Sequence, residues 1–227
     1  MNAPAGKIVI AGTGRAGTTL LVQLLTDLGL DTGFDPDAAI DRRVNAGLES
    51  AVDAPDAPRI VKSPELSRRL GSVLARGGIV IDHVIIPIRD LDVATASRVR
   101  NTRYGADLHT WGGLFGTNRA TRQREALAVM LAELMDTVAR YDIDHTLLSF
   151  PRFAQDAAYT HRKLGFLAPE ISAGHWEQAL RARVDPTLIH EVPLSRREQR
   201  RTTLGTAYNQ MIVRPARAVR RLIRPER

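Results

Sequence analysis

A chain of 227 residues, of which 44% are hydrophobic and 25% charged, can bury one substantial core and is ordinary for a globular protein. The absence of cysteine excludes disulfides, thiolate catalysis and cysteine-based metal sites, and no apolar run approaches the ~18 residues of a membrane-spanning helix. The formal net charge of +7 comes from residues 195–227, which hold ten arginines and two glutamates, so we expect a basic tail on a near-neutral body and no nucleic-acid partner.

Strand and helix patterns alternate along the chain. Short apolar runs predict strands at 7–11, 59–61, 83–88 and 146–150. Apolar residues at helical spacing predict helices at 18–28, 64–76, 92–100, 122–141 and 156–164. The polar stretch 31–56 predicts a loop with a short helix near 38–44, and 101–121 an irregular insertion. The alternation predicts an α/β domain over residues 1–194, with a parallel sheet covered by helices on both faces, and a separate tail at 195–227.

The segment between the first strand and the first helix, residues 12–19, has the sequence GTGRAGTT. Its glycines let successive backbone N–H groups turn toward one anion, and the start of the following helix adds partial positive charge. The two threonine hydroxyls can donate to phosphate oxygens. We therefore predict a phosphate-binding loop made of Gly12, Gly14, Arg15, Ala16, Gly17, Thr18 and Thr19.

Two other interpretations of this loop stay open. One is a glycine-rich turn that binds no ligand. The other is a dinucleotide fingerprint, since Gly12, Gly14 and Gly17 spell G-x-G-x-x-G, although no strand ending in an acidic residue follows about 20 residues on. A nucleotide kinase would carry lysine in place of Thr18, whereas here the cation stands three residues earlier, at Arg15.

A second anion site is predicted where the strand 83–88 ends. Arg89 follows that strand and Ser97 lies eight residues on, two turns into the next helix, so both side chains can reach one phosphate. Lys62 follows the strand 59–61, and we expect it at the same place because the carboxyl ends of parallel strands meet at one crevice. The ordinary alternatives are ion pairs of Arg89 with Asp90 or Asp92, and of Lys62 with Glu65. A solvated basic face is expected for Arg98, Arg100 and Arg103.

These motifs resemble those of sulfotransferases that use 3′-phosphoadenosine 5′-phosphosulfate (PAPS). Residues 14–20 (GRAGTTL) are similar to the 5′-phosphosulfate loop, Arg89 and Ser97 to the pair that grips the 3′-phosphate, and 60–65 (IVKSPE) to a stretch of the bacterial members. The resemblance covers roughly residues 7–167, strongly in the three motifs and weakly between them. It implies a three-layer P-loop fold with a central parallel sheet flanked by helices, PAPS as cofactor and adenosine 3′,5′-bisphosphate as product.

The reaction that the resemblance implies is transfer of a sulfuryl group from PAPS to a hydroxyl of a carbohydrate, lipid or small metabolite. Arg15 and Lys62 would stabilise charge on the departing phosphate, so no metal is expected. The best-known base of the family, a histidine two positions after the lysine, is replaced by Pro64. We favour Glu49 as the catalytic base, ahead of Asp35 and Asp37. The alternative function is that of a P-loop kinase-like phosphotransferase that binds a nucleotide.

The basic tail predicts a further contact. Beyond residue 210, apolar side chains recur at intervals of four, three and four with arginines between them, at Ile212, Ala216, Val219 and Ile223. Such a segment can lie on an anionic membrane, although a solvated tail and a protein partner stay open. Residues 1–6 lack the basic and apolar stretches of a secretory signal, so we predict a cytoplasmic protein. For its tail we favour a solvated segment, with peripheral membrane contact as an open alternative.

Overall fold

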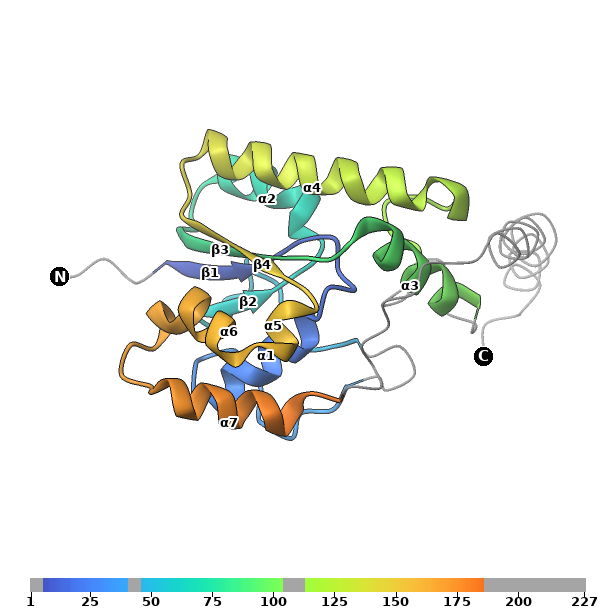
Figure 1. Cartoon of the computed structure of the whole chain (residues 1–227). Helices are drawn as coiled ribbons and strands as arrows, with labels where there is room; N and C mark the ends of the chain where they lie inside the picture. The colour runs from blue at the N-terminus through green and yellow to red at the C-terminus, as the bar shows by residue number, and fades with distance from the viewer. Residues whose placement is uncertain (1–5, 41–45, 104–112, 186–227) are drawn as a thin grey trace, which may run out of the picture.

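The computed structural model describes residues 6–40, 46–103 and 113–185, which fold around one parallel sheet (Figure 1). In this part of the chain the strands stand in the order β2-β1-β3-β4. Their bounds are β1 Lys7–Ile10, β2 Ile60–Lys62, β3 Ile81–Ile88 and β4 His145–Ser149. The helices are α1 Thr18–Asp27, α2 Leu66–Arg76, α3 Leu91–Arg103, α4 Gln123–Arg140, α5 Arg152–Gln155, α6 Ala157–Leu164 and α7 Ala173–Arg183, with 3₁₀ turns at Ala120–Arg122 and Gly165–Leu167. The predicted α/β class, with a parallel sheet flanked by helices, is confirmed.

Side chains of the central strands alternate between two cores, one on each face of the sheet. In β1, Ile8 and Ile10 pack with α1, α6 and α7, whereas Val9 packs with α2 and α4. In β3, Ile85 and Ile86 divide between the same two cores. Figure 1 shows the two helix layers on opposite sides of the sheet. Burial of both faces explains why these strands are almost wholly apolar rather than alternating with polar residues.

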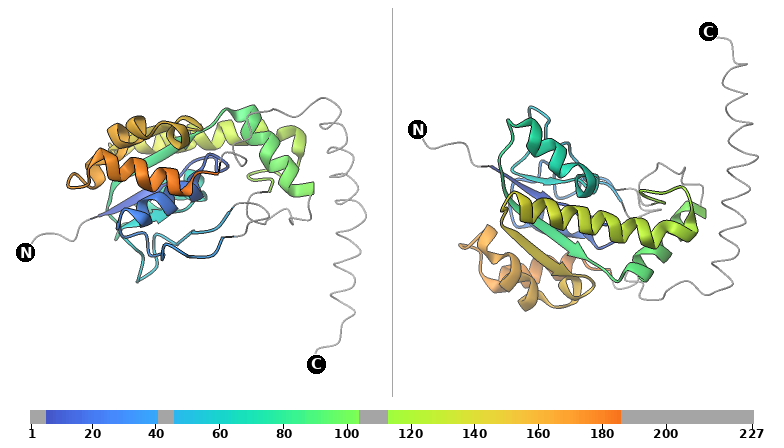
Figure 2. Two further views of the ribbon diagram at one scale, coloured as in Figure 1. Left: turned by 60° about the horizontal axis from the view of Figure 1, so that its bottom comes forward. Right: turned by 90° about the horizontal axis from the view of Figure 1, so that it is seen from above.

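The parallel strands all end at the same edge of the sheet, which we call the carboxyl edge. Ile10 is level with Lys62 across β1 and β2, and Ile88 is level with Ser149 across β3 and β4. The loop between β1 and α1 and the residue Arg89 therefore leave the sheet side by side. Helix α3 lies beyond this edge and packs against α4 (Figures 1 and 2). The strand ends and α3 together surround the residues that the sequence motifs single out.

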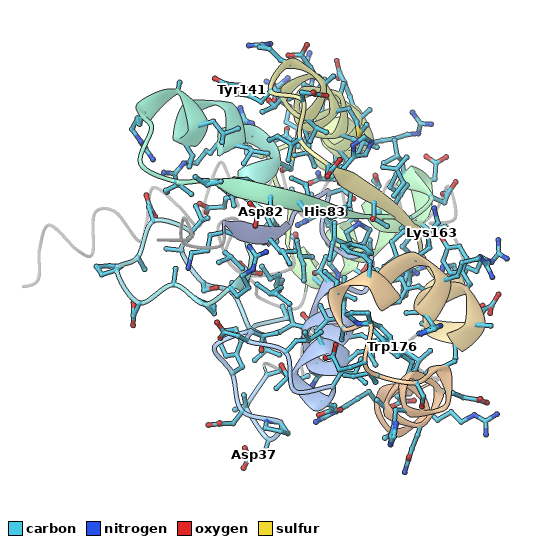
Figure 3. The ribbon with its side chains drawn as sticks, turned by 90° about the vertical axis from the view of Figure 1, so that its left-hand side faces the viewer. Asp37, Asp82, His83, Tyr141, Lys163 and Trp176 are labelled. Atoms are coloured by element: carbon cyan, nitrogen blue, oxygen red, sulfur yellow. The ribbon has the colours of Figure 1, made fainter. Side chains whose placement is uncertain are left out.

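Helix α7 was not predicted from the sequence. Its Trp176 and Leu180 pack into the core with α1 and α6. Figure 3 shows Trp176 beside α6 and α7. At its end, Nε and Nη2 of Arg183 donate to the two carboxylate oxygens of Asp27 in α1, each at 2.5 Å. Such a bidentate pair fixes the relative position of two helices that are far apart in the sequence.

Other predictions concern segments at the margins of the described chain. The short helix expected near 38–44 is wrong over 38–40, where the chain has no regular structure, and 41–45 lies outside the described residues. The predicted tail and the domain boundary at residue 194 also lie outside them. Within the described ranges, no helix is long and apolar enough to cross a membrane.

Candidate functional site

The loop between β1 and α1 has a backbone conformation that glycine favours. φ is +65° at Gly14 and +73° at Gly17, and Arg15 between them also has a positive φ, of +56°. Gly17 stands at the start of α1, where the first backbone N–H groups have no acceptor inside the helix. A loop of this kind, placed ahead of a helix, can direct several N–H groups at one anion.

Neighbouring side chains leave no room for a Cβ at two of these glycines. A Cβ on Gly17 would lie 2.7 Å from ring atoms of Phe150, which precedes α5, and of Phe153, which lies within α5. A Cβ on Gly14 would clash with Nη2 of Arg98, which comes from α3. The loop therefore lies between α5 and α3. Gly17 is required by packing against the two rings as well as by its φ, whereas at Gly14 the end of the Arg98 side chain can shift and the positive φ is the stronger requirement.

Arg15 links the two residues predicted to form the second anion site. Its Nε donates to Oγ of Ser97 at 3.0 Å, and Nη1 of Arg89 donates to the carbonyl of Arg15 at 3.1 Å. Arg89 is buried, and its Cζ lies 5.0 Å from the ring centroid of Phe150. Burial, and then the charge of Arg89, lower the pKa of Arg15 to about 10, so Arg15 remains charged at neutral pH. The structure thus brings Arg15, Arg89 and Ser97 into one network at the carboxyl edge.

Lys62 is 2% exposed at the end of β2. Its Nζ lies 3.0 Å from Oε1 of Glu49 and donates to the carbonyl of Gly47 at 2.6 Å. It also donates to Oγ1 of Thr19 at 3.4 Å, which connects it to the first turn of α1. These contacts place the lysine at the same edge as Arg15, whose charge contributes to lowering the pKa of Lys62. The lysine and the arginine network therefore form one site.

Glu49 is the carboxylate that the structure places at Lys62. Asp35 and Asp37, the other candidates for the base, are exposed, and Figure 3 shows Asp37 at the periphery of the molecule. Burial raises the pKa of Glu49, although the charge of Lys62 opposes this shift. Burial likewise lowers the pKa of Lys62, against the opposing charge of Glu49. The two shifts narrow the difference between the pKa of Glu49 and the pKa of Lys62.

The acidic residues in the alternative ion pairs have other partners. Glu65 lies 3.5 Å from Nη1 of Arg69, on the exposed side of α2. The carboxylate of Asp90 accepts from the backbone N–H groups of residues 92 and 93 and caps α3. Asp92 pairs with Arg124 at 2.8 Å. Lys62 therefore pairs with Glu49, and the alternative of a pair with Glu65 is wrong.

The prediction for Arg98, a solvated basic face, is also wrong. This side chain is 5% exposed, and its Nε and Nη2 donate to the carbonyl of Thr13 at 3.2 and 2.5 Å. Its Nη1 donates to the carbonyl of Gly113 at 2.7 Å. The signal that could have found it is helical spacing, because Arg98 lies four residues after Ala94 and so shares its buried face.

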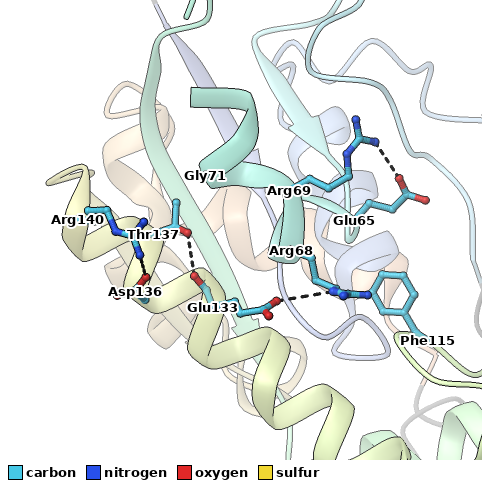
Figure 4. Close-up of a pocket in the computed structure, with 9 residues that line it drawn as sticks. All are labelled: Glu65, Arg68, Arg69, Gly71, Phe115, Glu133, Asp136, Thr137 and Arg140. Atoms are coloured by element: carbon cyan, nitrogen blue, oxygen red, sulfur yellow. Dashed lines mark hydrogen bonds and ion pairs between the residues drawn. The ribbon is translucent and has the colours of Figure 1, made fainter. Parts of the chain in front are cut away.

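A groove of about 560 Å³ lies elsewhere, between α2 and α4 (Figure 4). Its charged side chains largely satisfy one another, as in the pairs of Arg68 with Glu133 and of Arg140 with Asp136. Because each basic side chain in these pairs is already matched by an acidic one, the groove has little net positive charge to bind an anion. The carboxyl edge, with its buried cations and its loop, is the stronger candidate for chemistry.

Comparisons with known proteins add no assignment: no family model, curated protein or solved structure matches this chain significantly. The geometry of the carboxyl edge must therefore carry the functional argument. That geometry comprises a glycine-rich loop ahead of a helix, the half-buried Arg15 and the buried Arg89 beside Ser97, and a buried lysine paired with a carboxylate.

Proposed function

We propose that this chain is a PAPS-dependent sulfotransferase with a three-layer P-loop fold. The observation that carries the proposal is the convergence of Arg15, Arg89, Ser97 and Lys62 at the carboxyl edge. Arg15, Lys62 and Arg89 lie far apart in the sequence, and the ends of the parallel strands bring them together, with Ser97 added from α3. A ligand with two separate anionic groups matches an edge that carries cations from three strand ends.

Binding would divide between the two motifs. The loop from Gly12 to Thr19 would hold the 5′-phosphosulfate through its backbone N–H groups and the start of α1. Arg89 and Ser97 would hold the 3′-phosphate, which a guanidinium and a hydroxyl suit as donors. Since Arg15 contacts both motifs, it would lie between the two anionic groups.

Catalysis would rest on Lys62 and Glu49. When bound, PAPS supplies the sulfuryl group, whose bond to the phosphate oxygen breaks as a bond to the acceptor oxygen forms. Lys62 would donate to the departing oxygen, where negative charge grows. Glu49 would take the proton of the acceptor hydroxyl, and its raised pKa suits a base that works near neutral pH. The chemical class of acceptor is a hydroxyl compound.

A thermal-shift experiment tests this function against the phosphotransferase alternative. Full-length protein is heated with adenosine 3′,5′-bisphosphate, and separately with ATP and Mg²⁺ at equal concentration. A ligand at about 100 times its Kd stabilises the folded state by about 2.7 kcal/mol, which raises Tm by about 5–10 °C for a chain of this size. We expect this rise with the bisphosphate, in wild type and in Arg140→Ala but not in Arg89→Ala. No rise with the bisphosphate, or a larger one with ATP and Mg²⁺, would contradict the proposal.

A further inference from the structure

Arg98 forms hydrogen bonds to both the loop between β1 and α1 and the segment 113–115. Among the described residues, no other side chain forms hydrogen bonds to both. On one side it donates twice to the carbonyl of Thr13, and it packs against Gly14 so closely that a Cβ there would clash. On the other side it donates to the carbonyl of Gly113, and its Cζ lies 4.9 Å from the ring centroid of Phe115. One guanidinium thus contacts the phosphate loop and the segment 113–115 at once.

The segment 113–115 is held by side chains rather than by a helix or strand. The N–H of Leu114 donates to Oγ1 of Thr102 at 2.9 Å. Gln123, which is fully buried, both accepts from the N–H and donates to the carbonyl of Phe115, each at 2.8 Å. With Arg98 these contacts come from α3 and the start of α4. Loss of these side-chain contacts would open the segment 113–115 without unfolding the rest of the protein, because the segment does not belong to a helix or a sheet.

The electrostatic cost of the charge on Arg98 depends on the charges around it. Burial, and then the charge of Arg15, lower the pKa of Arg98 to about 9, while the charge of Glu49 opposes this shift. At neutral pH the guanidinium is therefore charged, at an electrostatic cost that its carbonyl acceptors and the ring of Phe115 partly offset. An anion on the loop would offset the charge of Arg15 and reduce that cost. The contacts made by Arg98 would then become harder to break.

We propose that Arg98 is a positioning residue that couples the phosphate loop to the segment 113–115, so that an anion bound on the loop stiffens this segment. The inference rests on the proposed function, because it requires the loop to bind a phosphate-bearing ligand. Beyond the proposed function, the inference connects the loop to the segment 113–115, which lies between α3 and α4 in the sequence. By linkage, whatever holds the segment in place also strengthens ligand binding on the loop.

The test is amide hydrogen exchange of the full-length protein, followed by NMR at Leu114 and Phe115 with and without adenosine 3′,5′-bisphosphate. Both amides are hydrogen-bonded to side chains, so they report opening of the segment. At about 100 times its Kd the ligand should slow their exchange at least about tenfold in the wild type. In Arg98→Lys, which keeps a basic side chain but loses the fork, the slowing should fall below about threefold.

Two further variants keep the test decisive if Arg98→Lys folds poorly. Phe115→Leu removes the ring under the guanidinium and leaves the loop contacts, so it should also reduce the slowing. Arg140→Lys alters an exposed ion pair in α4 and should behave as wild type. Calorimetry of ligand binding separates the proposed function from the coupling through Arg98.

If the ligand binds without slowing exchange at Leu114 and Phe115, the coupling alone is overturned. The same follows if Arg98→Lys and Phe115→Leu show as much slowing as the wild type. Absence of binding to wild type would overturn the proposed function and the coupling with it.

Discussion

Lys62 illustrates how a charged side chain is kept in a nearly dry place. Removal of an ammonium from water is costly, and one carboxylate, one carbonyl and one hydroxyl at hydrogen-bonding distance offset that cost. Each of these partners belongs to a segment other than β2, so the lysine holds the segment around Glu49 and the start of α1 at the same edge. Kinetics distinguish this role in holding the segments from a role in the chemical step.

The first prediction separates binding from chemistry. Arg89→Ala should weaken binding of adenosine 3′,5′-bisphosphate about 10–100-fold, because a hydrogen bond to a charged group contributes about 1.5–3 kcal/mol. Lys62→Ala should leave that affinity within about threefold and lower kcat about 10²–10³-fold, because charge on the departing oxygen grows only in the transition state. Calorimetry gives the affinities, and release of the bisphosphate from PAPS gives the rates. Normal turnover by Lys62→Ala would make the lysine structural.

The second prediction is a bell-shaped dependence of kcat on pH. Glu49 must be ionised to accept a proton, so the rate should rise as pH increases through the raised pKa of Glu49. Lys62 must be protonated to donate, so the rate should fall as pH increases further, through its lowered pKa. Glu49→Gln should abolish the acid limb and lower the rate about 10²–10⁴-fold, and Lys62→Arg should move the alkaline limb to higher pH. An unchanged acid limb in Glu49→Gln would remove Glu49 from the mechanism.

The residues of the candidate site differ in how far the sequence could place them. Arg15, Arg89 and Lys62 each follow a strand, and parallel strands end at one edge, so their proximity could be predicted. Glu49 could only be chosen from three carboxylates, because its position depends on how an irregular segment meets β2. Arg98 was misassigned, since an arginine in a helix is usually solvated and its carbonyl partners are not visible in a sequence pattern.

At the scale of elements, the loop between β1 and α1 combines two constraints that can be separated by mutation. Gly17 and Gly29 have nearly the same φ, +73° and +77°, but a Cβ on Gly29 would meet nothing within 4 Å. A positive φ costs a residue with a Cβ about 1–2 kcal/mol, and overpacking against rings adds about 1–3 kcal/mol. Gly17 therefore has to be glycine for packing as well as for its φ, whereas Gly29 is favoured by its φ alone.

The third prediction uses this pair of glycines. Gly29→Ala should lower the free energy of unfolding by about 1–2 kcal/mol, and Gly17→Ala by about 1–3 kcal/mol more, because only the latter meets Phe150 and Phe153. Gly17→Ala should also abolish binding of the bisphosphate, while Gly29→Ala retains it. Urea unfolding and calorimetry provide both readouts. Equal losses of stability in the two variants would show that the rings yield, and retained binding would show that the loop tolerates the displacement.

The elements themselves were predictable where periodicity was strong. Each predicted strand and each long helix begins and ends within two residues of the element observed, apart from the end of α3, which extends three residues beyond the prediction. Helix α7 escaped because its fully buried apolar face is thin, with Trp176 and Leu180 as the buried residues of the helix. The hydrophobic contacts of such a helix come from α1 and α6, which the local sequence does not reveal.

At the scale of the whole molecule, charge is distributed unevenly. The body is near neutral, yet the described structure gathers Arg15, Lys62, Arg89 and Arg98 at one edge. Such a concentration of cations raises the local concentration of anions and favours a ligand with more than one anionic group. The arginine-rich tail adds charge in a part of the chain outside the described residues, and its contact with a membrane stays a prediction.

The most direct test of the central claim is whether the site distinguishes a second phosphate. Isothermal titration calorimetry of the full-length protein compares adenosine 3′,5′-bisphosphate with AMP, which lacks the 3′-phosphate. We predict at least about tenfold tighter binding of the bisphosphate, equal to about 1.4 kcal/mol, because Arg89 and Ser97 would contact that phosphate. In Arg89→Ala the ratio should fall toward one, and in Arg140→Ala it should stay as in wild type. Equal affinities of the wild type for the bisphosphate and AMP would contradict the account.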